Sequence, residues 1–265
     1  MTHAGPFIRR SSCLYIYIYI YINLRALSPV FLRSLAFSAA LSLIEIFAIW
    51  IWTHRKFFCT SRKMNGEDRV QRPLFGGAIS SCFPLRFQDV SNIREVPDHQ
   101  EVFADPDRDE SLIFELLDLK HEVGDGGSAV WFLQDIAREQ DAEETMVLEH
   151  SGTLEAVGLT GLNGPAIVTT AVAHMAIAKG RQGREAQNLV RVYLANLRLK
   201  EVSTDVVITA YEPILINPLS ESARTVRAGL AIPAAQAGCL PMSAVFKLGI
   251  TSFKVHDWSL FSSGA

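Results

Sequence analysis

The chain has 265 residues, 49% of them hydrophobic and 20% charged, so it is long enough for a sizeable core. Its net charge of −3 hides a strong asymmetry, because residues 1–63 carry eight of the 25 Lys and Arg but one of the 28 Asp and Glu. Residues 64–265 therefore carry a net −10, which argues against nucleic acid or an anionic membrane as partner and favours a basic protein surface. The same balance also suits an acidic protein that needs only solubility.

The cysteines predict free thiols rather than a disulfide framework or a metal site. None of the four forms a C-x-x-C pair, and no histidine cluster accompanies them. We therefore expect a reduced compartment, no metal and no cofactor. The four positions are Cys13, Cys59, Cys82 and Cys239.

The first 63 residues differ in character from the rest. Tyr15 to Ile22 is four Tyr-Ile units, which is what an in-frame TA repeat in DNA encodes. We interpret residues 1–63 as translated upstream sequence or another non-native extension, with Met64 as the working start and 64–265 as a single domain. The alternative is a membrane anchor or targeting segment, because Leu35 to Trp52 is mostly apolar and about long enough to span a bilayer.

The next segments predict two strands and a helix. Strands are expected at 74–83 and 100–104, and an amphipathic helix at 110–123, with Asp109 as its cap. On a helical wheel the apolar residues of 110–123 share one face, and Glu115, Asp118 and Glu122 share the other. The acidic stripe is either a solvated face or a binding surface.

The second half is rich in β-type patterns. Residues 129–136 predict a buried strand or the start of a short helix, and the glycines of 158–165 predict a turn rather than a phosphate loop, because their spacing is wrong and Pro165 removes a donor. Helical patterns follow at 223–230, broken by Pro233, and at 242–250. Strands are expected at 146–150 and, as an antiparallel meander, at 167–177, 190–199 and 202–211.

No motif indicates catalysis. The sequence lacks a G-x-S-x-G elbow, an H-E-x-x-H pair and a Cys-His arrangement. Glu115 and Asp118 could act as the paired carboxylates of a glycosidase, but the local sequence shows no aromatic sugar cleft. The residues alone therefore predict an acidic α+β protein that binds a partner and is not an enzyme.

Three motifs carry a resemblance to a known family. They are LFGGAIS at 74–80, DVS-x-x-R-x-VPD-x-QEVF at 89–103 and DESLI-x-ELLD at 109–118. Their order and spacing resemble the Ran guanine nucleotide release factor family. Weaker similarity continues at 196–199, at 204–208 and in the tail 253–261, so the resemblance covers about 74–261 and none of 1–63.

The resemblance implies both a fold and a partner. The fold would be an α/β/α sandwich with a curved, mostly antiparallel sheet, as in the photosystem protein PsbP. The function would be binding of the small GTPase Ran and promotion of nucleotide release, in support of nuclear transport, by a monomer in nucleus and cytoplasm. By motif position, the acidic residues that would face Ran are Asp89, Asp98, Glu101, Glu115 and Asp118.

Two segments depart from the family pattern. Cys82 to Arg86 stands where Pro-Pro-Gly is expected, and Arg86 beside Asp89 would weaken an acidic patch. Gly229 to Gly238 has no clean helical pattern, which leaves the packing of the C-terminal helix open. A PsbP-like accessory role in chloroplasts is the alternative function, since the fold alone does not determine function.

Overall fold

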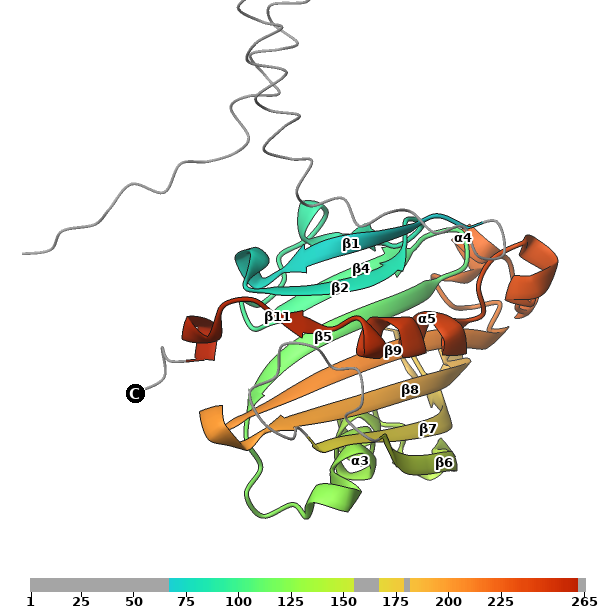
Figure 1. Cartoon of the computed structure of the whole chain (residues 1–265). Coiled ribbons are helices and arrows are strands. Elements are labelled where there is room, and N and C mark those ends of the chain that lie inside the picture. Colours follow the sequence, from blue (N-terminus) through green and yellow to red (C-terminus); the bar gives the residue numbers. More distant parts are fainter. Residues whose placement is uncertain (1–66, 155–166, 179–181, 262–265) are drawn as a thin grey trace, which may run out of the picture. The chain divides into compact units, whose positions relative to one another are not determined.

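A computed structural model describes residues 67–154, 167–178 and 182–261 (Figure 1). All of these belong to one compact unit, Phe58–Ala265. The expectations for residues 1–63 and for the glycines of 158–165 fall outside the described residues. Within the described ranges, no helix is both long and apolar enough to cross a bilayer.

An eight-stranded antiparallel sheet forms the centre of the fold. Its order is β3-β4-β5-β9-β8-β7-β6, and β10 pairs with the end of β9 (Figure 1). The strands are β3 (Gln88–Asp89), β4 (Gln100–Asp105), β5 (Glu110–Asp118), β6 (Val147–Leu154), β7 (Ile167–Ile177), β8 (Asn188–Leu199), β9 (Thr204–Ile216) and β10 (Gly229–Leu230). The structure thus confirms the predicted strands at 100–104 and 146–150 and the meander, which is β7, β8 and β9 in neighbouring antiparallel pairs.

The predicted helix at 110–123 is wrong, because its first nine residues form strand β5. Strand β5 pairs with β4 on one side and β9 on the other. Asp109 does not cap a helix; it has a positive φ of 57° in the turn that joins β4 to β5. Alternate residues such as Leu112 and Phe114 are fully buried, which is a period of two rather than 3.6. Pairing with two neighbouring strands outweighs local helix propensity.

A second, three-stranded sheet packs beside the first. It consists of β1 (Arg69–Leu74), β2 (Ile79–Pro84) and β11 (Lys254–Val255), in the order β1-β2-β11. The strand predicted at 74–83 is therefore interrupted, since Phe75, Gly76 and Gly77 have positive φ values and form a tight turn. Glycine accepts this backbone conformation without strain, which explains the Gly-Gly pair.

Helices cover both faces of the large sheet, as the predicted α/β/α sandwich requires. Helix α3 (Ser128–Glu139) packs on β7 and β8, and α5 (Met242–Thr251) packs on β2 and β9 (Figure 1). Each helix seals its own hydrophobic core. Residues 129–136 are thus helical, whereas the helix predicted at 223–230 shrinks to α4 (Ala223–Val226) followed by β10.

Short 3-10 helices connect these elements. They are η2 (Phe75–Gly77), η3 (Val90–Asn92), η4 (Asp125–Gly127), η5 (Glu143–Thr145), η6 (Arg184–Ala186), η7 (Lys200–Val202), η8 (Ala234–Ala237) and η9 (Trp258–Phe261).

A buried arginine fastens the segment after β5 to the sheet. Arg198 on β8 pairs through Nε with the fully buried Asp205 on β9, at 3.1 Å. Its terminal nitrogens donate to the carbonyl oxygens of Lys120 and Val123, each at 2.6 Å. Asp205 in turn accepts from the backbone N–H of Lys120 at 2.9 Å. The chain leaving the acidic strand β5 is therefore held by one guanidinium and one carboxylate.

We expect Arg198→Ala to lower the free energy of unfolding by about 3–5 kcal/mol, because it leaves the Asp205 carboxylate buried without its charge partner. Urea unfolding of the variant and the parent measures this difference. Arg138→Ala is the control, since Arg138 is 54% exposed and its loss should change stability by no more than about 0.5 kcal/mol. Equal stability of the two variants would contradict a structural role for Arg198.

Candidate partner-binding surface

The five acidic residues singled out from the sequence lie at one end of the large sheet, on β3, β4, β5 and the turn before β4 (Figure 1). Strand β3 is the edge, β4 pairs with it, and β5 follows. The sequence motifs thus come together in space, but their side chains do not share one face.

Asp89 closes strand β3 and begins the 3-10 helix η3. Its Oδ1 accepts a hydrogen bond from the backbone N–H of Ser91 at 2.8 Å and from the Ser91 hydroxyl at 2.6 Å. It lies opposite Phe103 in the β3–β4 register, so it points to the side of the sheet covered by α5. These bonds fix the carboxylate at the sheet edge.

Glu101 lies on the same face as Asp89, because it is two residues from Phe103 along β4. Its Oε1 accepts a hydrogen bond from the backbone N–H of Phe75 at 2.6 Å, which ties the Gly76-Gly77 turn to the large sheet. Burial raises the pKa of Glu101; the Phe75 N–H opposes this rise, and the charge of Asp89 adds to it. Glu101 is therefore a structural acceptor and a member of an acidic pair.

Glu115 and Asp118 point to opposite faces, contrary to the shared helical face expected from the sequence. Residues three apart alternate sides on a strand, whereas they lie together on a helix. Glu115 lies opposite Val207, on the α3 side, and its Oε1 accepts from Gln100 Nε2 at 2.5 Å. His99 Nε2 is 3.6 Å from the same oxygen.

The charge of Glu115 also affects the pKa of Tyr211 on β9. Burial raises the pKa of the Tyr211 hydroxyl above its ordinary value, and the carboxylates of Glu115 and Glu139 raise it further. Glu139 belongs to α3, which covers the side of the sheet that Glu115 also faces.

Asp98 and Asp118 are the exposed members of the set. Asp98 lies in the turn before β4, where the N–H of Gln100 donates to the carbonyl of Pro97 at 2.9 Å. Asp118 is the last residue of β5. Unlike Glu101, both side chains are exposed, so a partner can reach them without rearrangement of the sheet.

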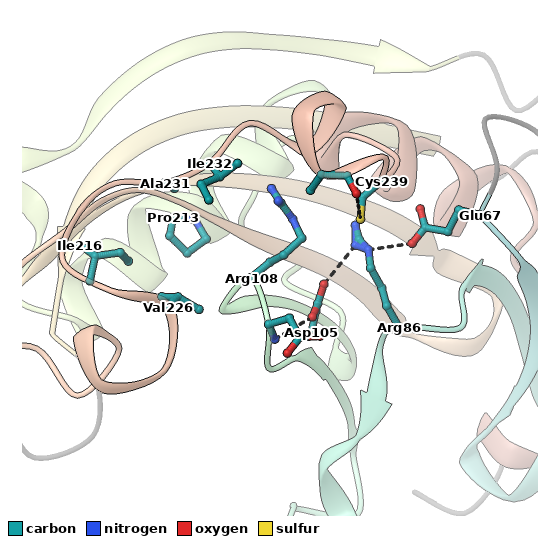
Figure 2. Close-up of a pocket in the computed structure, with 12 residues that line it drawn as sticks. Glu67, Arg86, Asp105, Arg108, Pro213, Ile216, Val226, Ala231, Ile232 and Cys239 are labelled. Atoms are coloured by element: carbon teal, nitrogen blue, oxygen red, sulfur yellow. Dashed lines mark hydrogen bonds and ion pairs between the residues drawn. The ribbon is translucent and has the colours of Figure 1, made fainter.

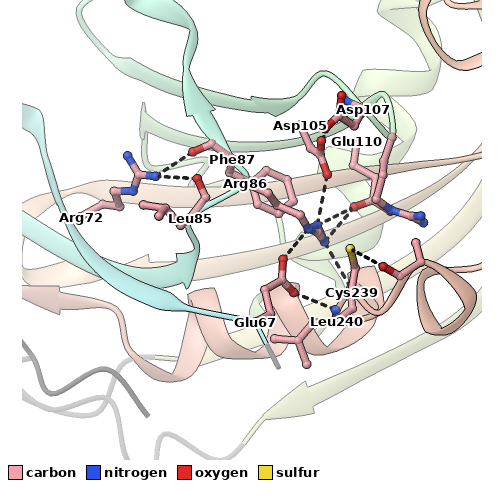
Figure 3. A network of polar contacts seen from close by, with 12 residues as sticks. Glu67, Arg72, Leu85, Arg86, Phe87, Asp105, Asp107, Glu110, Cys239 and Leu240 are labelled. Carbon is pink, nitrogen blue, oxygen red and sulfur yellow. Dashed lines mark hydrogen bonds and ion pairs between the residues drawn. The ribbon is translucent and has the colours of Figure 1, made fainter. Parts of the chain in front are cut away.

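Arg86 does not oppose Asp89, as the sequence had suggested. Its guanidinium lies in a separate, largely buried cluster with Glu67 at 2.9 Å, Asp105 at 3.4 Å and Glu110 at 2.9 Å (Figure 3). The departure from the family pattern at 82–86 therefore leaves the acidic edge unpaired by this arginine.

The cation near Asp89 is Arg72, which sequence reasoning missed. It donates to the carbonyl oxygens of Leu85 and Phe87, at 3.3 and 2.8 Å (Figure 3). Its guanidinium also lies over the Phe83 and Phe103 rings. Burial lowers its pKa and the charge of Asp89 opposes this. The sequence of β1 does not predict these contacts of Arg72, because they depend on how the two sheets pack.

The arrangement places several carboxylates where they can bind cations. Among the residues that the structure describes, no group of three or more His, Cys, Asp or Glu could hold a metal ion. Carboxylates at a sheet edge bind guanidinium and ammonium groups through charge-assisted hydrogen bonds. The fold is an α/β/α sandwich with carboxylates on the strands at one edge of its large sheet.

Comparison with known proteins identifies the family. The family model described as "Ran-interacting Mog1 protein" matches residues 72–213. The chain therefore belongs to the Ran-interacting Mog1 family. The match spans β1 to β9 and includes all five acidic residues.

Individual relatives agree with this assignment. The chain is 36% identical to a Ran guanine nucleotide release factor of Danio rerio, over 58% of this chain and 84% of the relative. It is 32% identical to that of Bos taurus, over 74% of this chain and 98% of the relative. The crystal structure of the Saccharomyces cerevisiae Ran-binding protein Mog1p shares the fold, with 23% identity, a TM-score of 0.50 and coverage of 74% and 99%. None of these supports the chloroplast alternative.

Glu101→Gln should become increasingly stable relative to the parent as pH rises. The folded protein binds the Glu101 proton more tightly than the unfolded chain does, so its ionisation penalises the folded state. The penalty begins near the ordinary value of 4.5 and is complete above the raised folded pKa. Urea unfolding at several pH values from 4 to 8 measures it, and a difference that does not change with pH would contradict the analysis.

Glu101→Ala is the companion variant, because it also removes the acceptor of the Phe75 N–H. We expect it to be less stable than Glu101→Gln by about 0.5–1.5 kcal/mol, the net contribution of one hydrogen bond.

Proposed function

We propose that this protein binds the small GTPase Ran and promotes release of its guanine nucleotide, in support of transport between nucleus and cytoplasm. The observation that carries the proposal is that the Mog1 family match, at 72–213, contains the whole acidic edge. The relatives' names, Ran guanine nucleotide release factor and nuclear import protein, describe this activity. We further propose that the protein acts as a monomer, without cofactor or catalytic residue.

The acidic edge supplies a physical route to nucleotide release. Carboxylates on β3, β4 and β5 can engage the basic side chains of a GTPase, including those that otherwise hold phosphate. A protein that binds the nucleotide-free state more tightly than the nucleotide-bound state lowers nucleotide affinity by the same factor. This requires differential binding and no covalent step.

We propose that Asp89, Asp98, Glu101 and Asp118 contact Ran directly. Asp89 and Glu101 share the α5-side face, Asp118 ends β5 toward the same side, and Asp98 is exposed beside them. Glu115 remains part of the proposed surface, but it points to the α3 side and is held by Gln100. A partner seated on Asp89 and Glu101 would contact Glu115 only by reaching around the sheet edge.

The double variant Asp98→Lys, Asp118→Lys should bind Ran about tenfold or more weakly, mainly through a slower association rate, because both acids are exposed. Its stability should change little, by about 0.5 kcal/mol or less per site. The measurement is release of a fluorescent guanine nucleotide from Ran, together with binding kinetics, at two salt concentrations.

The matched control is Glu143→Lys, Glu144→Lys, which changes the net charge equally at two exposed sites beside α3. An equal loss in both double variants would mean that net charge, and not the acidic edge, drives association. If the parent protein neither binds Ran nor changes the release rate, the proposed function is wrong.

A further inference from the structure

A pocket with a volume of about 360 Å³ is lined by none of the five acidic residues assigned to Ran (Figure 2). It is formed by the β4–β5 turn, the end of β9 and the segment from α4 to η8. A volume of this size falls in the range of about 300–1,000 Å³ that is usual for small-molecule sites. The pocket is therefore large enough to admit a small organic ligand.

Arg108 presents an unused hydrogen-bonding edge in this pocket. Its Nε donates to Glu110 Oε1 at 2.8 Å, and Glu110 is almost completely buried. Among the described residues, the terminal nitrogens of Arg108 have no recorded hydrogen bond or ion pair, although the side chain is only 12% exposed. Figure 2 shows its guanidinium beside the apolar wall that contains Ile232. A guanidinium fixed at Nε is preorganised for a planar anion at its other edge.

The remaining lining residues divide into an apolar wall and the charged side chains Glu67, Arg86, Asp105 and Asp107. One wall consists of aliphatic and proline side chains from β9, α4 and the segment that follows β10, which are Pro213, Ile216, Val226, Ala231, Ile232 and Ala237. Ile232 is 66% exposed, and the neighbouring Leu230 is 81% exposed. A ligand body that covered this wall would remove apolar surface from water.

The carboxylates near the pocket are paired with arginines, except for the exposed Asp107, which also lines it. Glu67 and Asp105 direct their ion pairs to Arg86, and Glu110 is shared between Arg86 and Arg108. The outer edge of Arg108 is left without a carboxylate of its own. Arg227, which is exposed, directly follows the pocket-lining Val226 in the chain and adds positive charge. Burial raises the pKa of Asp105 and of Glu110, and the nearby Arg86 and Arg108 oppose this rise.

We propose that this pocket binds a small organic acid, with its carboxylate on the terminal nitrogens of Arg108 and a short acyl chain against the wall formed by Val226, Ala231 and Ile232. None of the residues that line the pocket is among the five acidic residues assigned to Ran. It adds a small-molecule ligand to a protein whose proposed partner is a GTPase.

The test is a titration of the full chain, labelled with ¹⁵N, with hexanoate, followed by NMR. Saturable shifts are expected at the Arg108 Nε–H and at the amides of 230–232. Hexanol keeps the apolar body without the charge, acetate keeps the charge without the body, and hexylamine reverses the charge. Each should bind at least tenfold more weakly than hexanoate.

Two variants assign the interaction to the pocket. Arg108→Lys keeps the positive charge but loses the planar fork, and should weaken hexanoate binding tenfold or more. Ile232→Asp, at an exposed position, should weaken it similarly without unfolding the protein, and therefore decides the question if Arg108→Lys is unstable. Arg138→Lys on α3 is the control and should bind as the parent does.

Three results would overturn the proposal. They are the absence of saturable shifts with hexanoate, equal binding of hexanol or hexylamine, and undiminished binding by the folded Arg108→Lys or Ile232→Asp variant.

Discussion

The antiparallel pairing of β5 with β9 is the constraint on which the rest of the structure depends. It runs from Ser111 opposite Tyr211 to Asp118 opposite Thr204 and joins the hairpin β4–β5 to the meander β7–β9. Without it the large sheet would split into two smaller sheets, each with an unpaired edge. The register also determines the side of the sheet to which each residue points. Phe114, opposite Ile208, lies in the core under α5, whereas Glu115, opposite Val207, points toward α3.

Much of the fold could be predicted from the sequence, because the long strands carry a clear pattern. The meander, the strand at 100–104 and the helix at 242–250 follow from runs of β-branched or aliphatic residues between turn signals. The segment 110–118 could not be predicted in this way. Both faces of this strand are at least half-buried, so apolar residues occur next to each other, as at Leu112–Ile113 and Leu116–Leu117. The resulting spacing resembles that of an amphipathic helix.

The candidate site shows a similar division. The motifs identified the acidic residues, which the structure places at one end of one sheet. The side of the sheet to which Glu115 and Asp118 point could not be predicted, because it depends on whether 110–118 is a helix or a strand. The partners of the arginines were also beyond the sequence. Arg86 and Asp89 are three residues apart, yet Arg86 pairs with Glu67, Asp105 and Glu110, because the packing of the two sheets determines which charges meet.

Strand β6 has a consequence for how the molecule avoids self-association. It forms the long edge of the large sheet, all eight of its residues are exposed, and its register with β7 shifts between Leu148 and His150. Glu149, at this bulge, is paired with His174 and Arg191. The bulge interrupts the even row of backbone donors and acceptors that a strand from another molecule would need, and the charged side chain lies at the interruption. Among the described residues β6 is the last strand of the sheet, and the bulge and the charge make its edge a poor template for pairing with another molecule.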